Sequence, residues 1–201
     1  MPEPCFDDLR HVTAAEIPLA ALTLAEAFVD DPLMMHLNGG SPVSVARGLP
    51  LFTTFLRVQV GRGIVVATPG FEGVAVWSPP DQWKVPITAI LRNAPTFVKL
   101  YGWRLARNLR VLDDLERKHP REPHYYLEFV GTSPAFRSKG FGTPLIEPLV
   151  ARADAEGVGM YLENSSPDNM AFYGRFGFET RDVIRHRHDG PPHWLMWRDP
   201  R

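Results

Sequence analysis

The chain has 201 residues, of which 44% are hydrophobic and 11% aromatic, so it can bury one sizeable core and is too short for two comfortable domains. Its 22 Lys and Arg residues nearly balance its 23 Asp and Glu residues, which argues against nucleic acid or an anionic membrane as the main partner. The single cysteine, Cys5, excludes an internal disulfide framework. We therefore expect one domain over residues 1–201, monomeric or homodimeric, in a reducing, cytoplasmic setting.

The first part of the chain has the patterns of a short strand and two helices. Residues 9–12 predict the strand, and Thr13 and Glu16 have the spacing of a capping box that opens a helix. Asp30-Asp31-Pro32 is expected to end that helix. Apolar residues at helical intervals predict a second helix over residues 43–60.

A hairpin and a long helical region are predicted in the middle of the chain. Segments 63–68 and 73–77 are β-like and are joined by a Pro-Gly turn. Residues 87–117 have a helical pattern, which we expect Pro95 to interrupt. Between residues 84 and 121, nine Lys and Arg residues stand against three acidic ones. This excess indicates a solvated helical face or a positive lobe near an anionic ligand, and we favour the solvated face because surface charge usually serves solubility.

Strands and helices alternate in the rest of the chain. The predicted elements are a strand over 124–132, a helix ending near 156, a strand over 159–163, a short helix over 168–175, and a hairpin made of 178–188 and 193–197. Together with the preceding elements they indicate a mixed α/β domain.

The turn Arg137-Ser138-Lys139-Gly140-Phe141-Gly142 lies between a predicted strand and a predicted helix. Such a junction collects free backbone N–H groups and the positive end of the helix dipole, which together suit a phosphate group. On its own the turn could equally be an ordinary connection, since it lacks both the P-loop pattern and the first glycine of the dinucleotide fingerprint. In the helix after it, Pro144 falls in the first turn, whereas Pro148 is expected to bend the helix.

Two neighbouring blocks make the turn specific. Residues 126–134 precede it, and Asn169-Met170-Ala171-Phe172-Tyr173-Gly174-Arg175-Phe176-Gly177-Phe178 follows it. In this order and spacing, the three blocks resemble the GCN5-related N-acetyltransferase (GNAT) family, with its R/Q-x-x-G-x-G turn and its N-x-x-x-Y-x-x-x-G-F block. The resemblance covers residues 123–178. Further segments, among them 25–32, 74–80 and 162–167, resemble the puromycin N-acetyltransferase-like members.

The resemblance implies a GNAT fold, a mixed α/β sheet whose fourth and fifth strands splay apart around acetyl-CoA, the co-substrate. It implies that the pantetheine arm pairs with the fourth strand like an added strand and that the diphosphate rests on the amides of the turn. Ser138 stands where glycine is common, which we count as a mild departure. The implied cofactor-binding residues are Val130, Gly131 and Thr132; Arg137, Ser138, Lys139, Gly140, Phe141, Gly142 and Thr143; and Asn169, which would hold the pantetheine or cap the short helix.

The implied reaction is direct acetyl transfer to a primary amine of a small molecule. A backbone N–H near Val130 would stabilise the oxyanion. Tyr173 would protonate the departing thiolate, because a phenol of pKa ~10 keeps its proton at neutral pH; the alternative is a packed aromatic ring. Glu128 would accept the proton of the amine, and Tyr126 occupies the other position at which family members place a base. Alternatively, Glu128 binds the ammonium group of the acceptor or forms an ion pair with a strand neighbour.

Two other functions stay open: an acyl-CoA-binding sensor without catalysis, and a protein lysine acetyltransferase. The long segment 85–119 favours the cover of an enclosed pocket over an open peptide groove. His186, His188 and His193 could ligate zinc, but no carboxylate pattern beyond Asp189 supports this, and no metal is expected. Neither nucleic acid nor a membrane is expected as a partner.

Overall fold

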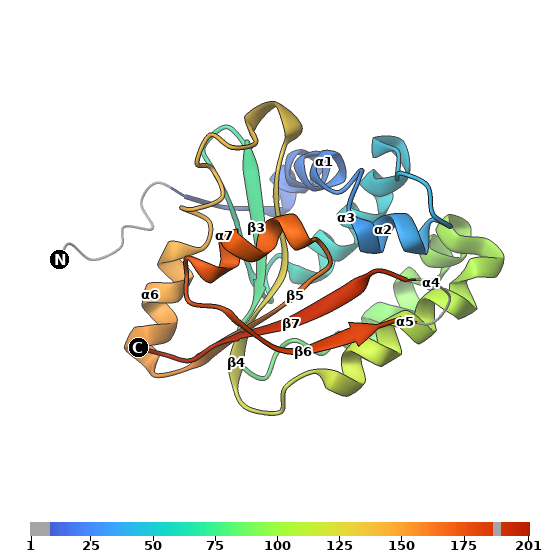
Figure 1. Ribbon diagram of the computed structural model, residues 1–201. Coiled ribbons are helices and arrows are strands. Elements are labelled where there is room, and N and C mark those ends of the chain that lie inside the picture. Colours follow the sequence, from blue (N-terminus) through green and yellow to red (C-terminus); the bar gives the residue numbers. More distant parts are fainter. Residues whose placement is uncertain (1–8, 187–189) are drawn as a thin grey trace.

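A seven-stranded sheet forms the centre of the computed structural model, which describes residues 9–186 and 190–201 (Figure 1). Cys5, His188 and Asp189 lie outside the described residues. The strands are β1 (Arg10–His11), β2 (Ile64–Ala67), β3 (Gly73–Ser78), β4 (His124–Thr132), β5 (Gly159–Asn164), β6 (Glu179–Arg185) and β7 (Pro192–Arg198). Their order is β1-β2-β3-β4-β5-β7-β6, with β4 and β5 parallel and the other neighbours antiparallel. This confirms the predicted mixed α/β architecture and both predicted hairpins.

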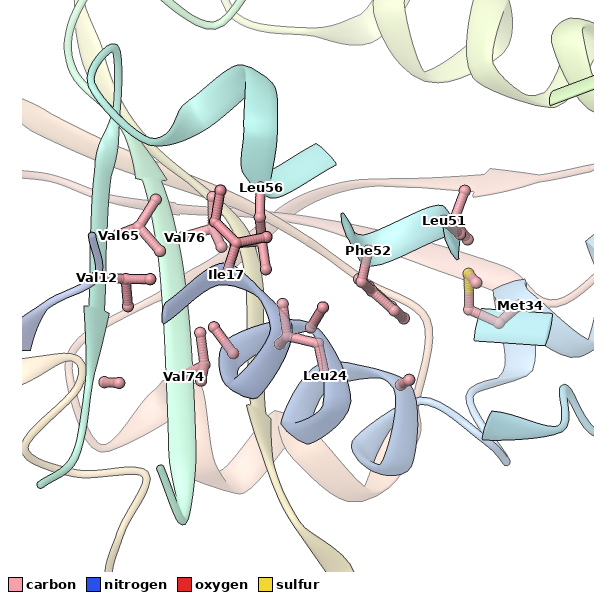
Figure 2. Close-up of a cluster of buried hydrophobic side chains, with 14 of the residues drawn as sticks. Val12, Ile17, Leu24, Met34, Leu51, Phe52, Leu56, Val65, Val74 and Val76 are labelled. Atoms are coloured by element: carbon pink, nitrogen blue, oxygen red, sulfur yellow. The ribbon is translucent and has the colours of Figure 1, made fainter. Parts of the chain in front are cut away.

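Helices cover both faces of the sheet. They are α1 (Ile17–Ala27), α2 (Pro32–Leu37), α3 (Val45–Gln59), α4 (Ile87–Tyr101), α5 (Leu105–Lys118), α6 (Glu147–Glu156) and α7 (Met170–Gly174). One core cluster joins α1, α2 and α3 to β2 and β3, and Figure 2 shows Leu24, Leu56 and Val76 within it. A second cluster joins α6 and α7 to the opposite face, through residues such as Leu149 and Leu127. We call these the α1–α5 face and the α6 face of the sheet, since α5 joins the first cluster through Val111.

The N-terminal capping signals are confirmed, with one correction. Glu16 accepts a hydrogen bond from the Thr13 amide at 3.0 Å, which completes the predicted capping box. The Asp-Asp-Pro sequence follows the end of α1, as expected, but it also opens α2, a helix that was not predicted. Asp31 accepts a 2.9 Å hydrogen bond from the Met34 amide, and Pro32 is the first residue of the helix. An Asp N-cap followed by Pro is a start signal as much as a stop signal.

The structure corrects all three proline predictions. Pro95 does not interrupt α4, which continues to Tyr101 and ends at Gly102, where φ is +51°. Pro95 is exposed, so water can satisfy the carbonyl whose hydrogen bond it removes. Pro148 does not bend a helix, because α6 begins at Glu147 and places Pro148 in the first turn, where no N–H is needed. Pro144 precedes α6.

Strands β4 and β5 separate halfway along their length. Their parallel pairing runs from His124 opposite Gly159 to Leu127 opposite Leu162. Beyond that point β4 continues to pair with β3, and β5 continues to pair with β7. The expected divergence of the fourth and fifth strands is therefore confirmed, and we call the gap between them the opening.

A β-bulge lies where the two strands part. Phe129 pairs with Val76 and Leu127 pairs with Trp77, so Glu128 is an extra residue on β4. A bulge changes which face the following residues occupy. Leu127 and Val130 both pack on the α6 face, while Phe129 packs on the α1–α5 face. Because of this shift, Glu128 lies at the start of the opening, directly after Leu127, the last β4 residue that pairs with β5.

Candidate active site

The outer edge of β4 forms one wall of the opening. From Glu128 to Thr132, β4 pairs only with β3 among the described residues. Alternate residues on such an edge point N–H and C=O groups away from the sheet, where an extended ligand can pair with them. Val130, Gly131 and Thr132 belong to this edge.

Gly131 also has a packing reason to be glycine. A Cβ at this position would lie 2.6 Å from the Cβ of Ala27 and 3.2 Å from the ring of Phe28. The end of α1 therefore lies directly against the backbone of β4. Ser133 extends this contact by donating a 2.8 Å hydrogen bond to Glu26.

The predicted phosphate turn has an unusual set of unpaired amides. No hydrogen bond among the described residues engages the N–H groups of the five residues from 138 to 142. Consecutive free N–H groups in a turn make a concavity that suits an anion. Helical hydrogen bonding starts directly after them, because the carbonyl of Thr143 accepts from the Ile146 and Glu147 amides at 3.0 and 3.1 Å. The free amides of the turn therefore lie just before α6, which begins at Glu147.

Backbone strain marks the same turn. Ser138 has φ of +59° and Gly140 has φ of +89°. For a serine this left-handed conformation costs about 1 kcal/mol or more, so the departure from glycine at this position has an energetic cost. Gly142 cannot carry a side chain freely, since a Cβ would lie 3.1 Å from the ring of Phe172. That contact places the turn against α7.

The side chains of the turn contact the protein. Arg137 donates to the carbonyl of Ala27 at 2.8 Å, and Lys139 donates to the carbonyl of Ala135 at 2.9 Å. The Phe141 ring meets the Phe136 ring edge-on, with centroids 5.6 Å apart. Arg137 thereby ties the turn to the end of α1, the same helix end that packs on β4.

Glu128 is held by one of its two carboxylate oxygens. The Gln59 amide of α3 and the Ser78 hydroxyl of β3 both donate to Oε1. No hydrogen bond among the described residues engages Oε2. Burial raises the pKa of Glu128 above its ordinary value, and the two hydrogen bonds and the nearby Arg62 only partly oppose this. The carboxyl is thus oriented, has a free oxygen, and is a stronger base than an exposed glutamate.

A second carboxylate lies across the opening from Glu128. Glu163 follows Leu162, the last β5 residue paired with β4, and its side chain is 12% exposed. The hydroxyls of Tyr126 and Tyr161 each donate to it at 3.1 Å. Burial, reinforced by Glu163, raises the pKa of Tyr126 well above its ordinary value. Tyr126 therefore stays protonated, which favours Glu128 over Tyr126 as the base.

Tyr173 lies on the other face of the sheet, in the cluster formed with α6. It is 8% exposed, and its ring packs against Phe172 and Phe178 at centroid distances of 5.3 and 6.2 Å. No hydrogen bond among the described residues uses its hydroxyl. Burial, with a smaller contribution from the Asp31 carboxylate, raises the pKa of Tyr173 well above its ordinary value. The phenol is a protonated donor at all physiological pH values.

The structure adds a contact that the sequence did not indicate. Asp31, which caps α2, accepts a 2.6 Å hydrogen bond from Ser165, directly after β5. Burial raises the pKa of Asp31. The end of α1 and the segment after it therefore reach both walls of the opening. Glu26 of α1 bonds Ser133 on the β4 side, and Asp31 bonds Ser165 on the β5 side. Only the resemblance of residues 25–32 and 162–167 to one subgroup pointed to these two segments together.

Asn169 occupies the N-cap position of α7, but its side chain makes no capping hydrogen bond there. The capping role is therefore not seen, and a role in holding pantetheine stays a prediction. His186 Nε2 and His193 Nδ1 are 2.9 Å apart. Within the described residues no group of three or more His, Cys, Asp or Glu side chains could hold a metal ion.

Comparison with known proteins gives a consistent result. Residues 96–178 match the family model for the acetyltransferase (GNAT) family. An uncharacterized N-acetyltransferase of Schizosaccharomyces pombe is 29% identical over 95% of this chain and 83% of that protein. A crystal structure described as histone acetyltransferase HPA2 and related acetyltransferase, from Corynebacterium glutamicum, is 29% identical with a TM-score of 0.71 over 96% of both chains. Arylalkylamine N-acetyltransferase 2 of Aedes aegypti shares the fold, at 15% identity and a TM-score of 0.68 over 96% of this chain and 98% of that one.

Proposed function

We propose that this chain, whose residues 96–178 match the GNAT family model, is an acetyl-CoA-dependent N-acetyltransferase. We propose further that its acceptor is the primary amine of a small molecule and that residues 1–201 act as one domain. The oriented carboxylate of Glu128, with Oε2 free at the opening, carries this proposal. Gln59 of α3 donates a hydrogen bond to that carboxylate. Helices α4 and α5 extend the helical layer on the same face of the sheet. We infer that this layer covers the acceptor site, which favours a small acceptor over an extended peptide. The likeness to puromycin N-acetyltransferase-like proteins stays a prediction.

We propose that acetyl-CoA enters along the outer edge of β4. Its pantetheine would pair with main-chain groups of Val130, Gly131 and Thr132. Its diphosphate would accept hydrogen bonds from the free amides of residues 138–142, next to Arg137, Lys139 and Thr143. The contact between Gly142 and Phe172 supports this path, because it puts the turn beside the helix that carries Tyr173.

The two proposed catalytic residues would act from opposite faces of the sheet. Glu128 Oε2 takes a proton from the acceptor's ammonium group, which frees the nitrogen lone pair. The amine then forms the C–N bond at the thioester carbonyl, while a backbone N–H near Val130 stabilises the oxyanion. When the C–S bond breaks, Tyr173 donates its proton to the sulfur. The proton lost by the nitrogen as the amide forms restores the phenol.

An amine panel tests the proposal. The protein is incubated with acetyl-CoA and with arylalkylamines, diamines, aminonucleosides or a lysine peptide, and the free thiol of CoA and the acetylated product are measured. We expect turnover with a small amine, and loss of turnover in Glu128→Gln but not in Glu179→Gln, an exposed glutamate on β6. Turnover with the lysine peptide alone would instead identify a protein acetyltransferase, an activity named for the Corynebacterium glutamicum neighbour. Binding of acetyl-CoA without release of CoA would identify a sensor.

A further inference from the structure

The helical segment 84–112 exposes more apolar surface than its fold requires. We call this segment the helical tip; it comprises α4, the turn after it and the first half of α5. No residue of α4 is buried. Ile87, Leu91 and Val98 are 66%, 67% and 54% exposed, and Trp103 is 83% exposed. An exposed apolar stripe of this kind marks an interaction surface.

These apolar residues form an ordered stripe. At 100° per residue, Ile87, Leu91 and Val98 project within about 40° of one another around α4. Phe97 and Leu100 lie on a different side and pack into the core, where the Phe97 ring meets Phe55 at 6.0 Å. The stripe is therefore separate from the surface that anchors α4.

The charge of the helical tip is as uneven as its hydropathy. Six of the chain's 22 Lys and Arg residues lie between 84 and 112, with no acidic residue among them. The rest of the chain keeps 16 basic residues against 23 acidic ones, a balance of −7. The net charge of −1 thus conceals a cationic tip on an anionic body.

The basic side chains lie beside the apolar stripe. Arg92 and Lys99 are both exposed and project on one side of α4, and neither has an ion pair among the described residues. The Arg104 guanidinium lies 4.9 Å from the centre of the Trp103 ring. Arg107 is used structurally, since it donates to the carbonyl of His36 at 2.8 Å. Apolar residues, an exposed Trp and flanking cations together are the composition of a helix that lies in a membrane interface.

We propose that the helical tip docks onto an anionic lipid surface. Ile87, Leu91, Val98 and Trp103 would enter the boundary between headgroups and acyl chains, while Arg92 and Lys99 would pair with lipid phosphates and carboxylates. Figure 1 shows α4 and α5 at the end of the molecule opposite α6. The anionic body, repelled by the same surface, would then face the solvent. No described helix is long and apolar enough to cross a bilayer, so the contact would be peripheral.

The charge and the apolar stripe of the helical tip argue against a second copy of the chain and against nucleic acid as its partner. A two-fold interface between copies would place the cationic tip against an identical cationic tip. Nucleic acid would match the charge but would leave the apolar stripe unburied. An anionic lipid surface satisfies both features at once.

Vesicle sedimentation tests the proposal. The full chain is mixed with vesicles of phosphatidylcholine, with and without phosphatidylserine, at low and high salt. We expect binding only with phosphatidylserine and weaker binding at high salt. The double variant Arg92→Glu with Lys99→Glu and the double variant Leu91→Ser with Trp103→Ser are each expected to lower the partition coefficient by about tenfold or more.

Matched controls lie elsewhere on the surface. Leu19→Ser on α1 removes a leucine that is 52% exposed, and Arg57→Glu reverses an exposed charge on α3; neither is expected to change binding. All variants should keep the wild-type melting temperature. Equal sedimentation with both vesicle types, or unchanged binding in both double variants, would overturn the proposal. So would a dimer in light scattering that Leu91→Ser with Trp103→Ser abolishes, because a second copy would then cover the stripe. Turnover of an amine in solution is independent of this result.

Discussion

Replacing Glu128 with Gln separates the role of its carboxylate in catalysis from its effect on the stability of the fold. Gln has the same shape, and its Oε1 can accept the same hydrogen bonds from Gln59 and Ser78. Its nitrogen replaces Oε2, the oxygen without a partner, and cannot accept a proton. The substitution therefore removes the base while keeping its anchor.

The expected loss of turnover is that of a general base, about 10²–10⁴-fold in kcat, or roughly 3–5 kcal/mol of barrier. In contrast to this loss of turnover, the substitution is expected to increase the free energy of unfolding at neutral pH. Burial raises the pKa of Glu128 in the folded chain, so the ionised carboxylate destabilises the fold as pH rises from the unfolded value of 4.5 through the folded value. Above that range Glu128→Gln should be more stable than wild type, and below pH 4.5 the two should converge.

The assay combines steady-state turnover with thermal melts across this pH range. Wild-type kcat/KM should fall as the pH is lowered and Glu128 takes up its proton. The pH profile of the variant should lack this decrease. A variant that keeps wild-type turnover, or one that loses turnover only through a higher KM for the amine, would show that Glu128 is not the general base. The second result would make Glu128 a ligand of the acceptor's ammonium group.

Three further substitutions test other parts of the site. Tyr173→Phe should lower kcat by about tenfold or more while acetyl-CoA still binds, measured by turnover and calorimetry; unchanged turnover would remove the acid role. Ser138→Gly should relieve the positive φ and raise the free energy of unfolding by about 1 kcal/mol in urea titration; a loss of stability would contradict that reading. Gly131→Ala should cost about 1–3 kcal/mol and weaken acetyl-CoA binding, because its Cβ would meet Ala27. Gly174→Ala, with nothing within 4 Å, is its control.

Local patterns in the sequence predicted most of the sheet. The strand at 124–132 matches β4 residue for residue, because it is aromatic, β-branched and bounded by Pro123 and Pro134. The proline predictions failed where solvent exposure or position in a first turn removes the usual penalty, as at Pro95 and Pro148.

The site was predictable only as far as local motifs extend. The turn and Tyr173 could be identified from their spacing, and Glu128 from its strand. The bulge at Glu128 could not, since it depends on register with β3. Glu163 and Asp31 were missed for the same reason: the contacts of Glu163 with Tyr126 and of Asp31 with Ser165 join segments more than 30 residues apart. The sequence showed the basic excess between residues 84 and 121, but not the exposed apolar stripe beside it, because exposure depends on how α4 packs on the rest of the chain.

The most direct test is a crystal structure of the chain with acetyl-CoA. We expect the diphosphate within hydrogen-bonding distance of the amides of residues 138–142, the pantetheine paired with β4, and the sulfur beside the hydroxyl of Tyr173. A cofactor bound outside the opening, or one whose sulfur lies far from both Tyr173 and Glu128, would contradict this expectation.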